Sequence, residues 1–260
     1  MKRALFLSPH LDDVVFSCGA TLALWLQHGW EALVVTVFTG NTASPRGFAL
    51  QCQTSKGIPP EVDYMALRRA EDKMALAHLG QSSLLHWEFL EAPHRGYNSP
   101  PDLFAGVKEG DAVWHPITES LRHWEDLDGS LGFDAVFAPQ GLGNHVDHLH
   151  VIHALRSFPP ERVHWYRDTP YAIREPEANY SPLLPPDLVT RSVTFDQKIL
   201  DQKIAACCAY ASQIGFQFGG AQGVGDKLTA FHRAEAETQN TDPYAELFLQ
   251  APDAPPLFEL

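Results

Sequence analysis

Cysteine is scarce in this sequence, and the cysteines present do not form a framework. The 260 residues include four, Cys18, Cys52, Cys207 and Cys208, with no Cys-x-x-Cys pair, whereas secreted disulfide scaffolds are much richer in cysteine. A chain of this length buries on the order of 70 to 75% of its unfolded surface, which is enough to fold without a disulfide or a structural metal. We therefore expect a reducing, cytoplasmic location and a catalytic role for any metal ion.

Positive charge is also scarce, and long apolar runs are absent. Nineteen Lys and Arg stand against 32 Asp and Glu, so the formal charge is −13, and a surface of this sign repels a nucleic-acid backbone. No run approaches the roughly 20 apolar residues that a membrane span requires. Residues 4–7 are apolar, but Ser8-Pro9-His10 ends this stretch too early for a signal-peptide core. Neither nucleic acid nor a membrane span is expected.

Short apolar segments alternate with amphipathic ones along most of the chain. Strands are predicted at 3–8, 32–38, 84–88, 134–138, 162–166 and 188–195, and helices at 18–29, 62–79, 112–125, 148–158 and 197–211. This alternation predicts parallel strands joined by helical crossovers. We find no internal repeat and no linker, so we interpret residues 1–260 as one doubly wound α/β domain. Its sheet is expected to be mostly parallel with helices on both faces, and 252–260 to be a surface tail.

Two irregular stretches, 39–60 and 92–104, interrupt this pattern. Segments of this length without periodicity are uncommon in compact domains and are often functional, for example as lids. Asn41, Arg46 and His94 lie on these stretches and are candidates for contact with a ligand, although solvated loop residues are the usual interpretation.

Two clusters of histidine and aspartate follow the first and fourth predicted strands. Pro9-His10-Leu11-Asp12-Asp13 comes directly after the first strand, and Asn144-His145-Val146-Asp147-His148 comes shortly after the fourth. In a sheet of order 3-2-1-4-5 these strands are neighbours whose connections leave in opposite directions, so both clusters fall on the crevice at their carboxyl ends. Two imidazoles and a carboxylate that converge there can hold a catalytic zinc ion and leave a position for water.

The adjacent carboxylates Asp12 and Asp13 suggest a division of roles. Neighbouring side chains in an extended turn face apart, so one carboxylate can bind the metal while the other accepts a proton. A zinc-bound water has a pKa of about 7, and a carboxylate beside it can take its proton as it attacks a carbonyl carbon. The plainer interpretation, an Asp pair that caps a helix, does not account for both clusters. The pattern thus predicts hydrolysis of an amide or an ester.

Both motifs, in this order, resemble those of the PIG-L or LmbE-like zinc-dependent de-N-acetylases. That family carries Pro-His-x-Asp-Asp after its first strand and His-x-Asp-His after a later one, on a Rossmann-like fold, and removes acetyl groups from N-acetylglucosamine-containing substrates. The resemblance implies that His10, Asp13 and His148 bind zinc and that Asp12 is the base.

The resemblance also assigns roles to further residues. It implies that His145 is the acid or stabilises the oxyanion, and that Asp147 hydrogen-bonds to His145 and tunes it. On the predicted helix 62–79, an Arg-x-x-Glu spacing similar to the family's implies that Arg68 reaches substrate hydroxyls. The neighbouring Arg69 leaves open which arginine faces the site.

One departure from the family pattern concerns an aromatic hydroxyl. Some relatives place it two residues before the second motif, where this chain has Gly143. A tyrosine that serves this site would have to come from a loop, for example Tyr97. With Arg68 and Asn41, Tyr97 completes the candidate substrate-binding residues.

The resemblance implies a metal-dependent amide hydrolase that acts on linear C–N bonds. We expect a small amino-sugar substrate and one Zn²⁺ per chain, with another divalent ion such as Fe²⁺ and a homo-oligomer left open. One alternative is an amidase for a different amide, such as a thiol-sugar conjugate. Another is a non-catalytic metal-binding or sugar-binding module, against which the presence of Asp12 and His145 argues, because a binder requires neither.

Overall fold

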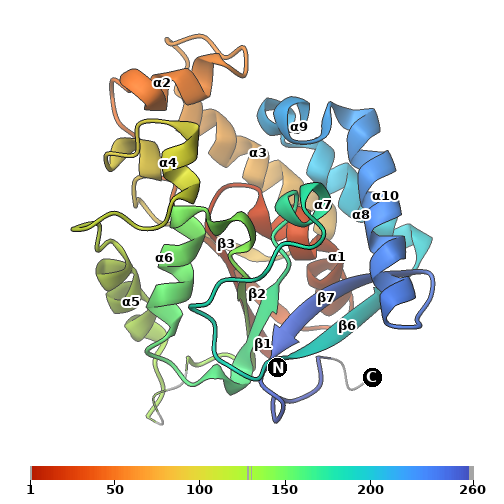
Figure 1. Cartoon of the computed structure of the whole chain (residues 1–260). Helices are drawn as coiled ribbons and strands as arrows, with labels where there is room; N and C mark the ends of the chain where they lie inside the picture. The colour runs from red at the N-terminus through yellow and green to blue at the C-terminus, as the bar shows by residue number, and fades with distance from the viewer. Residues whose placement is uncertain (1, 128, 130, 258–260) are drawn as a thin grey trace.

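A seven-stranded sheet forms the centre of the computed structural model, which describes residues 2–127, 129 and 131–257 (Figure 1). The strands are β1 (Arg3–Ser8), β2 (Glu31–Thr36), β3 (Ser83–His86), β4 (Ala135–Pro139), β5 (Val163–Tyr166), β6 (Val189–Phe195) and β7 (Tyr244–Gln250). Their order is β3-β2-β1-β4-β5-β7-β6. Strands β1 to β5 are parallel, and β7 is antiparallel to both β5 and β6. The predicted mostly parallel α/β sheet is confirmed.

Helices cover both faces of this sheet (Figure 1). They are α1 (Asp13–Gln27), α2 (Gly47–Thr54), α3 (Tyr64–Leu79), α4 (Pro100–Phe104), α5 (Trp114–Leu121), α6 (Val146–Leu155), α7 (Tyr171–Arg174), α8 (Gln197–Cys208), α9 (Ala211–Phe218) and α10 (Ala221–Thr238). Alternate residues of β1 enter two cores: Ala4 and Phe6 pack with α1, α3, α8 and α10, and Leu5 and Leu7 pack with α5 and α6. Because β1 is covered on both faces, it is a continuous apolar run instead of an alternating one.

The predicted elements differ from the observed ones mainly in the C-terminal part. The sequence predicts neither α10 nor β7, and the irregular stretch 39–60 contains α2. Glycines at the start of α10 hide its helical pattern, and a glutamate in the middle of β7, Glu246, interrupts an apolar run although its side chain is buried. Helix α1 begins at Asp13 instead of residue 18, with a non-helical residue at Cys18.

The C-terminal segment, expected to be a surface tail, has both exposed and buried residues in its described part. Residues 258–260 lie outside the described part of the chain, but Ala254 and Leu257 are buried, and Leu257 joins the core on the α1 side of the sheet. This part of the segment packs against the domain. Among the described residues, no helix has both the length and the apolar character needed to cross a bilayer.

The turn between β4 and α6 depends on two glycines with positive φ. Gly141 has φ 74° and Gly143 has φ 76°, a region that residues with a Cβ adopt rarely. A Cβ on Gly141 would lie 2.8 Å from Ile152 Cδ1, and one on Gly143 would lie 3.2 Å from Tyr171 Cδ1. The absence of a side chain thus lets α6 pack close to the turn at Gly141 and α7 pack close to it at Gly143.

We predict that Gly141→Ala lowers the free energy of unfolding by about 1–3 kcal/mol, because the methyl group adds steric overlap to a positive φ. The matched control is Gly215→Ala in α9, where a Cβ meets no heavy atom within 4 Å. That change should stabilise the protein or leave it unchanged. Urea unfolding of both variants tests this prediction, and equal midpoints would contradict it.

Candidate active site

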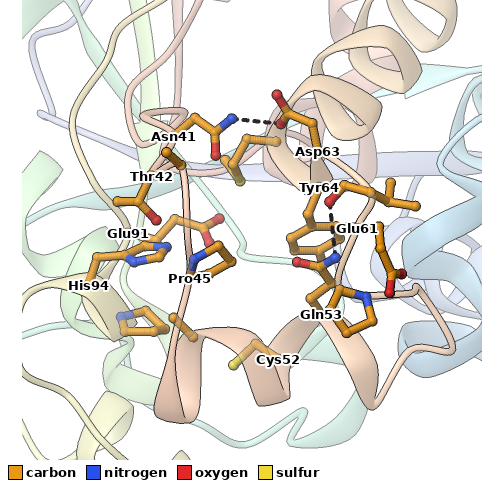
Figure 2. A pocket seen from close by; sticks show the side chains of 16 residues that line it. Asn41, Thr42, Pro45, Cys52, Gln53, Glu61, Asp63, Tyr64, Glu91 and His94 are labelled. Atoms are coloured by element: carbon orange, nitrogen blue, oxygen red, sulfur yellow. Dashed lines mark hydrogen bonds between the residues drawn. The ribbon is translucent and has the colours of Figure 1, made fainter.

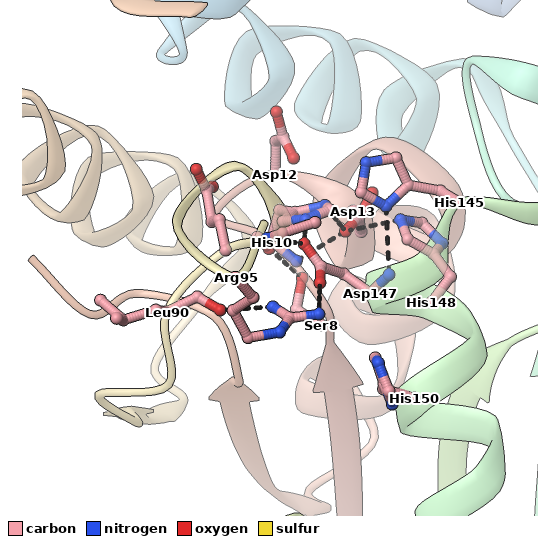
Figure 3. Close-up of polar contacts among 12 residues, drawn as sticks. Ser8, His10, Asp12, Asp13, Leu90, Arg95, His145, Asp147, His148 and His150 are labelled. Atoms are coloured by element: carbon pink, nitrogen blue, oxygen red, sulfur yellow. Dashed lines mark hydrogen bonds and ion pairs between the residues drawn. The ribbon is translucent and has the colours of Figure 1, made fainter. Parts of the chain in front are cut away.

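The two histidine and aspartate clusters meet at the carboxyl ends of β1 and β4, as the order of the strands predicts (Figure 3). His10 lies in the turn between β1 and α1, and Asp13 is the first residue of α1. The Ser8 hydroxyl fixes this turn, since it donates to the His10 carbonyl (2.6 Å) and accepts from the Val14 amide (3.1 Å). From the other side, His148 enters from the first turn of α6.

The Asp13 carboxylate lies between two imidazoles. Its Oδ2 is 3.3 Å from His10 Nδ1 and 3.4 Å from His148 Nε2. Tetrahedral ligands bound at about 2.0–2.1 Å to one zinc ion are about 3.3–3.4 Å apart, so both separations match a shared metal ion. His148 Nε2 is buried without a hydrogen-bond partner, as expected of a nitrogen reserved for a metal. The donor set therefore fits a divalent ion.

The other nitrogen of each imidazole faces a second carboxylate. His10 Nε2 donates to Asp147 Oδ2 (2.9 Å), and His148 Nδ1 donates to Asp168 Oδ1 (2.5 Å). Metal-binding histidines commonly have such partners, which fix the tautomer and the orientation of the ring. This arrangement leaves His10 Nδ1 and His148 Nε2 directed at Asp13.

His145 completes a group of three histidines that could also hold a metal. One ring nitrogen from each of His10, His145 and His148 lies within 4.8 Å of the others. Burial and the positive charge of His10 lower the pKa of His145 to about 3, which favours a neutral ring. To act as an acid, the His145 ring must carry a second proton. With this pKa the ring is neutral before the reaction begins.

The expected contact between the His145 ring and the Asp147 carboxylate is not formed. That carboxylate instead accepts from His10 and from the Ala92 amide (3.1 Å) and pairs with Arg95 (2.8 Å). Burial opposes the charge of Asp147, but the hydrogen bond from His10 and the charge of Arg95 outweigh burial and lower its pKa. The backbone amide of Asp147 donates to His145 Nδ1 (3.3 Å), because His145 immediately precedes α6 and caps it.

Asp12 projects away from Asp13, as the alternation of side chains predicts (Figure 3). It lines the cavity above the clusters, with its carboxylate 3.8 Å from the Arg68 guanidinium. Burial and the neighbouring charge of Asp13 raise the pKa of Asp12, and Arg68 opposes this shift. A buried carboxylate with a raised pKa is a better proton acceptor than an exposed one.

The cavity has a volume of about 430 Å³ and both polar and apolar lining. Polar groups of the two clusters line it. Apolar side chains from several helices line it as well, namely Phe16, Phe48, Leu103, Phe104, Tyr171 and Phe216. Phe216 is 68% exposed and Phe104 39%, so an apolar group of a ligand could cover both.

The three candidate substrate-binding residues have different surroundings. Arg68 lines the cavity, while Arg69 donates to the Thr39 carbonyl. Asn41 lines an adjoining cavity of about 160 Å³, where it donates to Asp63 (Figure 2). Tyr97 is fully buried and donates to Asp111 (2.9 Å), so the structure does not bring it to either cavity.

Two residues that contact the proposed site, Asp168 and Arg95, were not predicted from the sequence. Asp168 follows β5, the neighbour of β4, so the argument that placed the clusters at the sheet edge could also have found it. Arg95 lies in the irregular stretch 92–104 and reaches Asp147 from there. Nothing in the local sequence indicates that contact.

Comparisons with known proteins agree with this geometry. The model of the family described as PIG-L: GlcNAc-PI de-N-acetylase matches residues 5–158. The 2'-N-acetylparomamine deacetylase of Streptomyces fradiae is 32% identical over 176 residues, which are 65% of this chain and 58% of that protein. The chain thus matches less than two thirds of the length of such curated relatives.

Two solved structures are similar over almost the whole chain. The A40926 pseudoaglycone deacetylase is 28% identical, with a TM-score of 0.76 and coverage of 98% of both chains. A structure described as the zinc-inhibited form of teicoplanin deacetylase is 27% identical, with a TM-score of 0.75 and coverage of 97% of this chain and 100% of that one.

We predict that Asp168→Asn weakens metal binding by about 10-fold or more, because the amide no longer provides a charge that orients and polarises His148. Titration with Zn²⁺ against a chelating indicator measures this change. The control is Asp72→Asn, which alters another buried carboxylate that accepts from a histidine, His86, outside the clusters. Equal metal affinity in the two variants would contradict the prediction.

Proposed function

The chain belongs to the PIG-L family, and on this basis we propose that it is a metal-dependent hydrolase that removes the acetyl group from an N-acetylglucosamine-type sugar or sugar conjugate. The observation that carries the proposal is the Asp13 carboxylate between His10 and His148, with Asp12 lining the cavity of about 430 Å³ beside them. This arrangement supports a metal-binding role for Asp13 and a proton-accepting role for Asp12.

We assign His10, Asp13 and His148 as ligands of one divalent ion per chain. When bound, such an ion lowers the pKa of a water molecule to about 7 and polarises the amide carbonyl. Zn²⁺ suits two imidazoles and a carboxylate, and Fe²⁺ is the alternative. A relative whose structure is described as zinc-inhibited makes a comparison of metals, including excess zinc, part of the test.

The chain's own residues supply the remaining steps. Asp12 accepts the proton of the attacking water, for which its position in the cavity beside Asp13 is suitable. His145 faces the same cavity, and its neutral ring can donate a hydrogen bond to the carbonyl oxygen. The leaving amine cannot depart as an anion, so to act as the acid His145 must first take up a proton during the reaction, for example the one that Asp12 has accepted. Asp147 acts by holding His10, a role different from the one that the family resemblance implies.

The polar and apolar lining of the cavity suits different parts of a conjugated amino sugar. Arg68 provides donors for sugar hydroxyls, and Asn41 in the adjoining cavity can contact a substituent. The exposed rings of Phe216 and Phe104 can contact the non-sugar portion of a conjugate. An amidase for another conjugate, such as a thiol-sugar, would use the same polar groups, so a substrate panel is needed.

The test is release of acetate by the metal-loaded protein. The panel contains free N-acetylglucosamine, its aromatic and alkyl glycosides, an N-acetylated aminoglycoside and an N-acetylglucosaminyl thiol conjugate. Release from any N-acetyl sugar supports the proposal. Metal binding without release from any member would favour a binding module.

We predict that Asp12→Asn retains the metal while the rate falls by at least about 100-fold, because the amide cannot accept the proton. Metal analysis and kcat with the best panel substrate measure the two effects. His148→Ala is the contrasting variant, because it removes a proposed ligand and should lose most of the metal. Near-normal turnover by Asp12→Asn would show that the base lies elsewhere.

A further inference from the structure

Helix α1, which begins with Asp13, is interrupted one turn further along. Cys18 has non-helical angles, φ −132° and ψ 27°, so a short first segment that carries Asp13 is separated from the rest of the helix. On the far side of the break, the amides of Ala20 and Thr21 donate to the carboxylate of Glu246 in β7, at 3.0 and 2.7 Å. On the near side, the Ser17 carbonyl accepts from the ammonium of Lys203 in α8 (3.3 Å).

Lys203 and Glu246 form an ion pair of 2.6 Å with almost no solvent exposure. An ammonium has three donors, and those of Lys203 meet Glu246, the Ser17 carbonyl and His232 Nε2 (2.9 Å). Glu246 accepts from Lys203, from the two amides and from the Thr21 hydroxyl (2.6 Å), which uses about four acceptor positions. Both the ammonium of Lys203 and the carboxylate of Glu246 therefore have hydrogen-bond partners in all their positions.

The signs of the two charges suit the broken helix. A carboxylate is favourable where a helix segment begins and presents free amides, and a cation is favourable where one ends and presents carbonyls. A buried ion pair often contributes little net stability compared with apolar residues of similar volume. The specific gain here is that one pair caps both sides of the same break.

Ser17, whose carbonyl accepts from Lys203, also contacts the loop that carries Asp168. The Ser17 hydroxyl accepts from the Thr169 amide (3.0 Å), and the preceding residue is Asp168, which holds His148. The first segment of α1 therefore connects Asp13 to the carboxylate behind a second proposed ligand. Neither Lys203 nor Glu246 lines the cavity, and their direct hydrogen bonds to an element of the site are those to α1.

We propose that the Lys203–Glu246 pair is a positioning element for the metal site, which holds the first segment of α1 so that Asp13 and the Asp168 loop keep their places. This inference rests on the proposed function, because it takes Asp13 and His148 as metal ligands. The pair touches neither the metal nor the substrate, and it acts by fixing the break at Cys18.

The decisive variant is Glu246→Gln, which keeps the size of the side chain but presents an amide donor to Lys203 or to the α1 donors. The control is Glu235→Gln in α10. Glu235 is also buried, pairs with Arg167 at 3.2 Å and lies 3.5 Å from His232 Nδ1, and neither of these contacts is with α1. Thermal unfolding, Co²⁺ and Zn²⁺ affinity, the visible spectrum of the Co²⁺ form, kcat and KM are measured for both.

We expect metal affinity to fall by about 10-fold or more in Glu246→Gln, with an altered Co²⁺ spectrum and a lower kcat at little-changed KM. Glu235→Gln should keep the affinity and the spectrum of the wild type even if its Tm falls. A folded Glu246→Gln protein with wild-type affinity and spectrum would show that the pair serves stability alone, which overturns the inference.

If Glu246→Gln does not fold, Thr21→Val provides the same test in a milder form. It removes one hydrogen bond to Glu246 at similar volume, and an affinity about threefold weaker supports the inference while unchanged affinity overturns it. A wild-type protein that binds neither Co²⁺ nor Zn²⁺ would contradict the proposed function itself, and that result is distinct because it appears before any variant is compared.

Discussion

The Asp13 carboxylate is the group on which the arrangement of the site depends. Its Oδ2 accepts from the His10 amide (2.7 Å) and faces the His10 and His148 rings, so one oxygen joins the turn after β1 to the helix after β4. Those two strands are neighbours at the point where the strand order reverses, and their connections leave on opposite sides. Only there can a residue from each connection approach the same oxygen.

Around the Asp13 carboxylate, hydrogen-bond donors and carboxylates follow one another outward from the site. His10 and His148 each have a carboxylate behind them, and each of those carboxylates has a donor of its own: Arg95 pairs with Asp147, and the Leu142 amide donates to Asp168 (3.1 Å). Burial alone would make each charge unfavourable, but these partners compensate for the lost water. The same logic applies to Lys203 and Glu246, where a second buried pair holds the helix that carries Asp13.

The cavity beside this charged centre combines polar and apolar lining. The polar groups come from the two clusters, while Phe216 and Phe104 contribute aromatic rings that are 68% and 39% exposed. A shared fold does not fix a substrate, because function depends on the groups that line the site. In the proposed reaction, the groups that surround the reacting amide would therefore decide which conjugate is accepted.

The sequence by itself determined where the first five strands lie along the chain and where both clusters lie, because burial on both faces leaves apolar runs in the central strands and the clusters follow two of them. The order of these strands in the sheet agrees with the one expected for a doubly wound fold. The sequence also indicated that Asp12 and Asp13 diverge, which is a local property of the backbone.

The sequence did not predict β7, because a glutamate such as Glu246 is usually exposed and the local pattern does not indicate the partner that compensates its buried charge. It did not predict α10, because the glycines near its start are typical of a connector. Tertiary structure alone decided that Asp147 holds His10 instead of His145, that Arg95 joins the site, and that Tyr97 points to Asp111. Each of these contacts joins segments distant in the chain, and only the packing of helices on the sheet sets which of them converge.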